Sequence, residues 1–193
     1  MTYSSNMSNS LIPKHGGYRN LKSYQTTEII YDLTVKFCDK YLSYPSNKSY
    51  TRTIDQMVQA ARSGKQNIAE GSQASGTSKK TELKLVNVAR ASQEELLLDY
   101  EDYLRQHSLP LWVKNHPETQ KIRALAYSPN RSCMIYLSYL STAENAANCL
   151  ICLIHQANYL LDQQLRQLES DFLKYGGFTE RLYSARQDYK NKT

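Results

Sequence analysis

Residues that interrupt helices are scarce in this sequence. Among its 193 residues there are 7 glycines and 5 prolines. Apart from Gly64, they leave four long segments, at about 18–43, 50–71, 78–108 and 132–175. No segment alternates polar and apolar residues over the length of a strand, which argues against a sheet. The scarcity of breakers therefore predicts an all-α chain with four long helices.

The sequence also lacks the features of a membrane protein and of a secreted protein. No apolar run approaches the roughly 20 residues that a membrane span needs, and no basic and apolar leader opens the chain. We therefore expect no membrane association and a cytoplasmic location, where the 4 cysteines stay as free thiols. Phenylalanine and tryptophan are rare beside 16 tyrosines, which suit half-buried positions with one wet end.

Helical periodicity is what the four segments do contain. In the last segment, apolar residues step by three and four from Leu140 to Phe172, the pattern of a long bundle helix. Gly176 and Gly177 then supply its C-terminal stop. The earlier segments carry similar stripes: Ile30, Leu33, Phe37 and Tyr41; then Ile54, Met57, Val58, Ala61 and Ile68; then Leu83, Val86, Ala89, Leu96, Leu97, Tyr100 and Leu104.

Two short connections and one long one, at about 109–130, complete the pattern of an up-down four-helix bundle. In the long third connection we expect Pro117 to open a short helix and Trp112 to cover the end of the bundle. The expected organisation is a disordered or loosely docked tail at 1–17, the bundle at 18–177 and a basic, helix-capable C-terminal tail at 178–193.

The connection between the second and third segments, ARSGKQNIAEGSQASGTSKKTELK (61–84), raises the question of a phosphate-binding loop. Such a loop needs a preceding strand and the spacing GxxxxGK[ST], and both are absent here. We therefore interpret it as the corner of a helical hairpin, in which Gly71 ends one helix in a left-handed conformation. Ser78 or Thr77 is then expected to cap the next helix.

The same stretch resembles the hallmark of a family of small bacterial four-helix bundle proteins, RS-x-x-x-NIAEG followed by a polar turn and SKKE. Members include proteins encoded in intervening sequences of ribosomal RNA genes and accessory proteins of diversity-generating retroelements. The matching residues are Arg62, Ser63, Asn67, Ile68, Ala69, Glu70, Gly71, Ser78, Lys79 and Lys80, whereas Thr81 departs from the pattern.

A second stretch resembles a longer subgroup of that family, the four helix bundle suffix type. It comprises LRQHSLPLW and ENAANCLICLIHQANYLLDQQLRQLESDFLKYGGF. Together the two resemblances cover about residues 18–183. They imply an all-helical up-down bundle and, as in the retroelement relatives, a homopentameric ring that binds nucleic acid and a reverse transcriptase.

Charge is unevenly distributed along the chain, whose net charge is +6. Residues 46–90 hold eight basic and three acidic residues, a net charge of +5, whereas the following ASQEELLLDYED carries five acids and no base. A basic hairpin beside an acidic segment suits contact with a phosphate backbone or head-to-tail packing of identical subunits. A solvated surface with ordinary charge scatter is the third interpretation. The expected phosphate ligands are Arg52, Arg62, Lys65, Lys79, Lys80, Lys84 and Arg90.

Cys149, Cys152 and His155 are residue types that bind metals, but zinc needs four converging ligands. Positions i, i+3 and i+6 of one helix drift around its axis, so we expect the cysteines to pack in the core and no metal or other cofactor to bind. Asn145, Asn148, His155 and Asn158 form a polar row, which either fixes the register of the bundle or lines a ligand pocket.

No grouping of nucleophile and base, and no paired carboxylates, points to an enzyme. The leading hypothesis is a non-enzymatic, homo-oligomeric bundle that associates with DNA or RNA through the basic hairpin. The alternative is a structural or protein-interaction bundle whose charges serve self-assembly. A third hypothesis is a small-ligand binder that uses the polar row.

Overall fold

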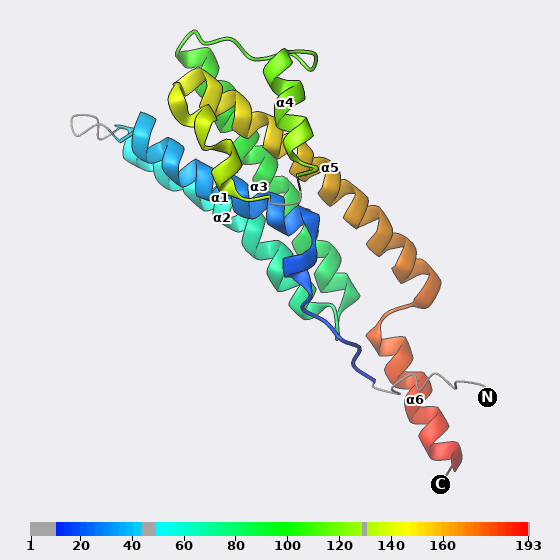
Figure 1. Cartoon of the computed structure of the whole chain (residues 1–193). Helices are drawn as coiled ribbons and strands as arrows, with labels where there is room; N and C mark the ends of the chain where they lie inside the picture. The colour runs from blue at the N-terminus through cyan, green and yellow to red at the C-terminus, as the bar shows by residue number, and fades with distance from the viewer. Residues whose placement is uncertain (1–10, 44–48, 129–130, 193) are drawn as a thin grey trace.

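The computed structural model describes residues 11–43, 49–128 and 131–192 of the chain. Its α-helices are α1 (Lys22–Tyr41), α2 (Ser49–Ala74), α3 (Lys79–Gln106), α4 (Pro117–Leu125), α5 (Ala143–Tyr175) and α6 (Phe178–Lys192) (Figure 1). Two 3-10 helices accompany them, η1 (Tyr18–Asn20) and η2 (Cys133–Ser141). Within the described ranges no strand occurs, which confirms the predicted all-α class.

The core lies among α1, α2, α3 and α5. Helices α1 and α3 each pack against both α2 and α5, so the four helices enclose one interior. In Figure 1 they run in a common diagonal direction, and the C-terminal part of α5 extends past the other three. Helix α4 packs on α5, and η2 lies against both α1 and α5.

The interior is filled by the predicted apolar stripes. Sixteen stripe residues are at most 1% exposed: Ile30, Leu33, Phe37, Met57, Ala61, Ile68, Val86, Ala89, Leu96, Tyr100, Leu104, Ala147, Leu150, Ile154, Ala157 and Leu161. Burying a large apolar side chain stabilises the fold by about 1.5–3 kcal/mol relative to leaving it exposed. Phe172 departs from the expectation and is 37% exposed.

Tyrosines occupy the centre of the core as well as its edges. The ring of Phe37 meets Tyr100 and Tyr103 edge-on, with 5.0 Å between centroids in both pairs. The fully buried hydroxyl of Tyr100 donates to Oγ1 of Thr34 on α1 over 3.0 Å. This bond satisfies the one polar group that a buried tyrosine brings into an apolar interior.

The period of the last long segment predicts a single helix, but the structure divides the segment into two elements. Residues Cys133–Ser141 form η2, and α5 begins only at Ala143, with the Thr142 hydroxyl accepting from the N–H of Asn145 over 3.2 Å. The carbonyl of Leu140 is instead bound from α1, by Nζ of Lys40 at 2.6 Å and the hydroxyl of Tyr41 at 2.7 Å. These contacts dock η2 against α1 and end the α-helical period.

The long third connection contains the expected short helix. Pro117 is the first residue of α4, and the ring of His116 accepts the N–H of Glu118 at the cap. Trp112 is half-buried against the start of α5, where its indole N–H donates to Glu144 over 3.0 Å. The tryptophan therefore ties this connection to α5.

The two tails are more ordered than the sequence suggests. Residues 178–192 form α6, none of which is buried, after Gly176 ends α5 with a φ of +67°. We call the turn between Ala74 and Lys79, with the helix ends beside it, the α2–α3 corner. Near the N-terminus, the N–H of Gly16 donates to the Ser72 carbonyl over 3.1 Å, so part of the expected loose tail docks on this corner. The expectation for residues 1–10 lies outside the described residues.

Candidate nucleic-acid interface

The basic hairpin is built from α2 and α3, which pack against each other. The hydroxyls of Ser63 and Ser92 share a hydrogen bond of 2.9 Å. A Cβ at Gly64 would overlap the amide of Gln93, and one at Gly71 would lie 3.4 Å from the Glu82 carbonyl oxygen. These small residues let the two helices approach closely, which holds the outward-facing cations on a rigid support.

Gly71 therefore plays a different part from the predicted one. It lies inside α2, which continues to Ala74, and it is not among the residues with positive φ. The expectation of a left-handed cap at Gly71 is wrong, because the close packing against α3 uses its missing side chain. The turn instead follows Ala74, and the Ser75 hydroxyl donates to the Ser72 carbonyl over 2.8 Å.

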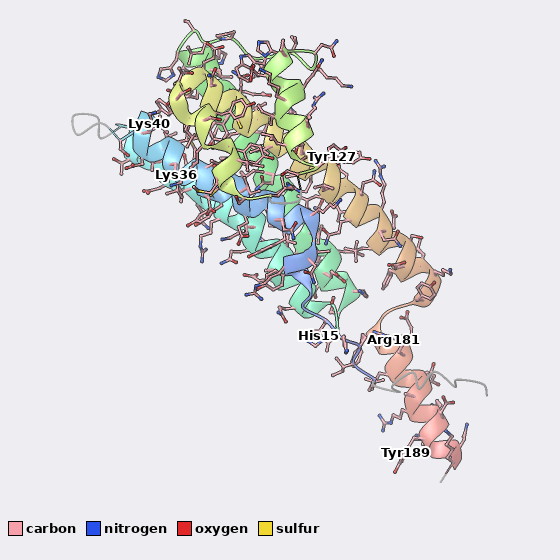
Figure 2. All side chains as sticks on the ribbon, in the orientation of Figure 1. His15, Lys36, Lys40, Tyr127, Arg181 and Tyr189 are labelled. Carbon is pink, nitrogen blue, oxygen red and sulfur yellow. The ribbon has the colours of Figure 1, made fainter. Side chains whose placement is uncertain are left out.

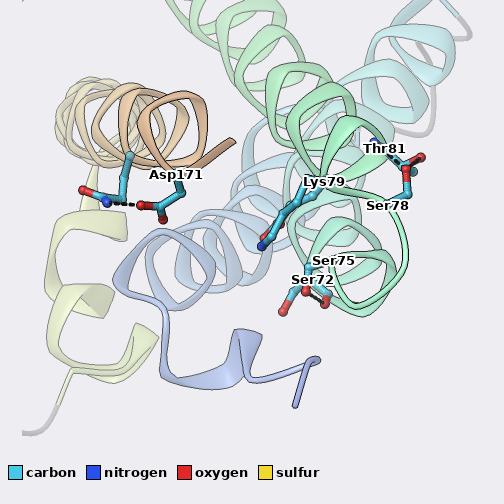
Figure 3. Close-up of polar contacts among 8 residues, drawn as sticks. Ser72, Ser75, Ser78, Lys79, Thr81 and Asp171 are labelled. Atoms are coloured by element: carbon cyan, nitrogen blue, oxygen red, sulfur yellow. Dashed lines mark hydrogen bonds and ion pairs between the residues drawn. The ribbon is translucent and has the colours of Figure 1, made fainter. Parts of the chain in front are cut away.

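Helix α3 begins at a serine cap, one of the two expected. The Ser78 hydroxyl accepts the N–H of Thr81 over 3.2 Å (Figure 3). Lys80 and Lys84 follow on one face of α3, since residues four apart are neighbours on a helix. Both are exposed, and neither forms an ion pair with a described residue. Their positive charge adds to that of the helix N-terminus.

Three of the other expected phosphate ligands are engaged within the protein. Nζ of Lys79 lies 2.8 Å from a carboxylate oxygen of Glu82. Nζ of Lys65 lies over the ring of Tyr31 on α1, 4.4 Å from its centroid. Arg90 forms two ion pairs that involve both its own helix and α5. The carboxylates partly neutralise the charges of Lys79 and Arg90, and the ring of Tyr31 holds Lys65 against α1.

Arg52 and Arg62 are exposed on α2 but are not gathered with the lysines of the corner. Arg52 stands 22 residues before the end of α2, which corresponds to about 33 Å along the helix. It also lines a hollow of about 790 Å³ between α2 and α3 together with the acidic Glu95. The structure thus separates the seven expected residues into a corner group, an engaged group and two arginines along α2.

The sequence analysis missed cations that the fold brings to the corner. Residues 11–17 cross it, so that the His15 ring packs against Gly76 and places the exposed Lys14 beside the turn. Arg181 of α6 and Lys79 line one hollow of about 300 Å³, and Figure 2 shows His15 and Arg181 at this end of the molecule. No local pattern in the sequence indicates this docking.

The five acids of the segment 91–102 lie in the second half of α3. Glu94 is paired with Arg90, and Asp102 with Arg105 at 2.7 Å. Burial, with Glu95 and Asp102 nearby, raises the pKa of Asp99 to about 6. Lys80 and Lys84 of the hairpin thus lie at the α2–α3 corner, whereas the acids of residues 94–102 lie nearer the far end of α3, where Arg52 of α2 also stands.

The CxxC motif belongs to the core. Cys149 and Cys152 are buried, as predicted, and burial raises the pKa of both thiols. A buried thiol with a raised pKa is a poor nucleophile and a poor metal ligand. No three metal-binding side chains converge among the described residues.

The polar row divides into structural residues and one surface residue. The side-chain amide of Asn148 accepts the backbone N–H of Trp112 over 2.8 Å and donates to the Pro110 carbonyl over 2.9 Å. Asn158 donates to Glu94 of α3 over 3.2 Å. These two asparagines fix the register, in agreement with that interpretation, whereas His155 is exposed and lines surface hollows.

None of the helices in the described part of the chain is long and apolar enough to cross a membrane. Compared with models of known protein families, with curated proteins and with solved structures, the chain matches none of them.

Proposed function

We propose that this protein is a non-enzymatic, homo-oligomeric bundle that associates with DNA or RNA in the cytoplasm. Its core helices α1, α2, α3 and α5 are the four helices of an up-down bundle, as in the bacterial family that the sequence resembles. The contact surface is the α2–α3 corner. The observation that carries the proposal is that Lys80 and Lys84, on the first two turns of the capped helix α3, are exposed and form no ion pair with a described residue.

Two physical effects favour an anion at this corner. The first turn of α3 concentrates unpaired backbone N–H groups and the positive end of the helix dipole. The lysines stand on a helix pair fixed by close packing at Gly64 and Gly71, so little of the support has to be ordered on binding. Contacts of this kind involve phosphates rather than bases, so binding is tolerant of sequence.

One such corner makes few phosphate contacts, and its affinity is correspondingly modest. A homo-oligomer repeats the corner and strengthens binding through multivalency, without any new contact. A pentameric ring is the assembly that the resemblance implies, and the subunit count is part of the proposal.

The proposal is tested by fluorescence anisotropy with mixed-sequence single-stranded and duplex oligonucleotides at low salt. K80Q/K84Q should weaken binding by about tenfold or more, because two phosphate contacts per subunit are lost. K36Q/K114Q is the matched control: it makes the same charge change at two exposed lysines that form no ion pair with a described residue, and Lys36 on α1 lies far from the corner (Figure 2). Absence of binding by the wild-type protein would overturn the proposal.

A second function, self-assembly without nucleic acid, is favoured by a different observation. The end of α5 and helix α6 expose apolar side chains, with Leu173 at 78% and Leu182 at 43%. In that case sedimentation velocity should show an oligomer that L173E/L182E dissociates. If the charges serve assembly instead, K80Q/K84Q should dissociate it.

A further inference from the structure

A second cationic surface lies away from the α2–α3 corner, where α4 ends beside α5 and the start of α1. A cavity of about 410 Å³ opens there. We call it the basic pocket, after the cations Lys22, Arg123 and Arg131, which line it together with His155, Tyr127 and Tyr159. Figure 2 shows Tyr127 at the end of α4. No aspartate or glutamate of the described residues lines this cavity, although Glu28, Asp32 and Glu101 line adjoining hollows.

The three permanent cations keep their charge available. None of them forms an ion pair with a described carboxylate. Nη2 of Arg131 donates to the Thr26 hydroxyl over 2.7 Å, and Nη1 of Arg123 points to the Lys114 carbonyl at 3.4 Å. Neutral acceptors thus orient the two guanidinium groups without neutralising them. Gathering like charges at one cavity is unfavourable unless an anion joins them.

Two exposed aromatic rings stand at the same cavity. Tyr127 is 87% exposed and Tyr159 is 64% exposed. Exposed tyrosines beside cations are the usual platform for stacking nucleobases. The cavity volume lies in the range of pockets that hold small organic ligands.

We propose that the basic pocket binds a nucleotide, with its phosphate against Arg123, Arg131 and Lys22 and its base against Tyr127 and Tyr159. Lys22 also begins α1, whose N-cap residue Leu21 supplies no capping side chain and whose first turn holds no acid. The ligand is either a free mononucleotide or the 5′-phosphorylated end of a single strand. This site goes beyond the proposed backbone contact at the α2–α3 corner and does not depend on it.

Isothermal titration of the full chain tests the inference with four probes: AMP, adenosine, and a tetranucleotide with and without a 5′-phosphate. AMP or the phosphorylated tetranucleotide should bind at least tenfold tighter than its counterpart without phosphate. Binding of AMP identifies a free nucleotide, and binding of the tetranucleotide alone identifies a strand end. If neither phosphate makes a difference, the proposal is wrong.

Two variants locate the ligand. R123Q/R131Q should reduce affinity by at least tenfold, whereas K80Q/K84Q should leave it unchanged. Y127A/Y159A removes only exposed rings, so we expect it to fold. It therefore tests the location of the ligand even if the arginine variant is destabilised. This variant should weaken the binding of the nucleotide about tenfold and leave the affinity for inorganic phosphate unchanged. Wild-type affinity in Y127A/Y159A, or in folded R123Q/R131Q, would overturn the assignment.

Discussion

Arg90 of α3 joins Asp162 of α5, with Nε 3.2 Å from Oδ1, while its Nη1 lies 2.7 Å from Glu94 one turn along its own helix. A cation held by two carboxylates adds little to the field outside the protein. Its role is to connect α3 with α5, and it therefore differs from Lys80 and Lys84 although all three lie on α3.

The first prediction concerns this bridge. R90Q should lower the free energy of unfolding by about 1 kcal/mol, the upper end for partly exposed pairs, and change nucleic-acid affinity less than twofold. Urea unfolding and anisotropy measure the two effects, and D162N should reproduce much of the stability loss. A loss of affinity in R90Q as large as in K80Q/K84Q would contradict the assignment.

The second prediction concerns the contact between Gly64 and Gln93. Alanine is a better helix former than glycine by about 1 kcal/mol, but its Cβ would overlap the buried amide of Gln93. Overpacking of this kind costs about 1–3 kcal/mol. After the helix-propensity gain is subtracted, G64A should lower the free energy of unfolding in urea titrations by up to about 2 kcal/mol.

A double variant separates overlap from other causes. Gln93 makes no hydrogen bond with either amide atom among the described residues, so Q93A removes the clash without breaking a bond. G64A/Q93A should be at least as stable as Q93A alone. If G64A is equally harmful in both backgrounds, the close approach of α2 and α3 at this point is not the reason.

The third prediction is a dependence of stability on pH. The pKa of Asp99 is raised from 3.8 to about 6 in the folded protein. Between pH 4 and 6 the folded chain thus holds more protons than the unfolded chain, and the Asp99 contribution to stability falls as pH rises. D99N should be about 1–2 kcal/mol more stable than wild type at pH 7, since partial exposure screens part of the effect.

Urea unfolding of both proteins at pH 4 and pH 7 checks this prediction. At pH 4 Asp99 is largely protonated and D99N should match wild type. An advantage of D99N that is equally large at both pH values would show that the charge of Asp99 is not its cause.

The fourth prediction concerns thiol reactivity. Burial raises the pKa of Cys38 to about 12 and also raises that of Cys149 and Cys152, whereas Cys133 is only half-buried. With Ellman's reagent at pH 8, one thiol should react quickly and three should react only as the protein opens. C133A should remove the fast phase, and two fast thiols in wild type would contradict the burial of the CxxC pair.

The extent to which the fold follows from the sequence differs between elements. Long helices and their buried faces are predictable because each stripe repeats at helical spacing, as from Ile30 to Phe37. The α-helical period breaks within the last segment without any glycine or proline, in CMIYLSYLS. The cause is η2 docking on Lys40 and Tyr41, about 100 residues earlier in the chain. A local pattern contains no information about that contact.

The candidate site shows the same limit. Counting charges identifies the hairpin as basic, and the sequence limits the cap of α3 to Ser78 or Thr77, of which the structure has Ser78. Counting does not separate Lys79, which pairs with Glu82, from its neighbour Lys80, which has no such pair. Nor does it reveal that Arg90 meets a carboxylate 72 residues away on α5.

The salt dependence of nucleic-acid binding tests the central proposal most directly. For duplex DNA, each phosphate contact contributes about 0.9 to the slope of log K against log salt. K80Q/K84Q should therefore lower the magnitude of the slope by about 1.8 per bound corner, while K36Q/K114Q leaves it unchanged. Equal slopes for wild type and K80Q/K84Q, or equal loss in both variants, would contradict a binding surface at the α2–α3 corner.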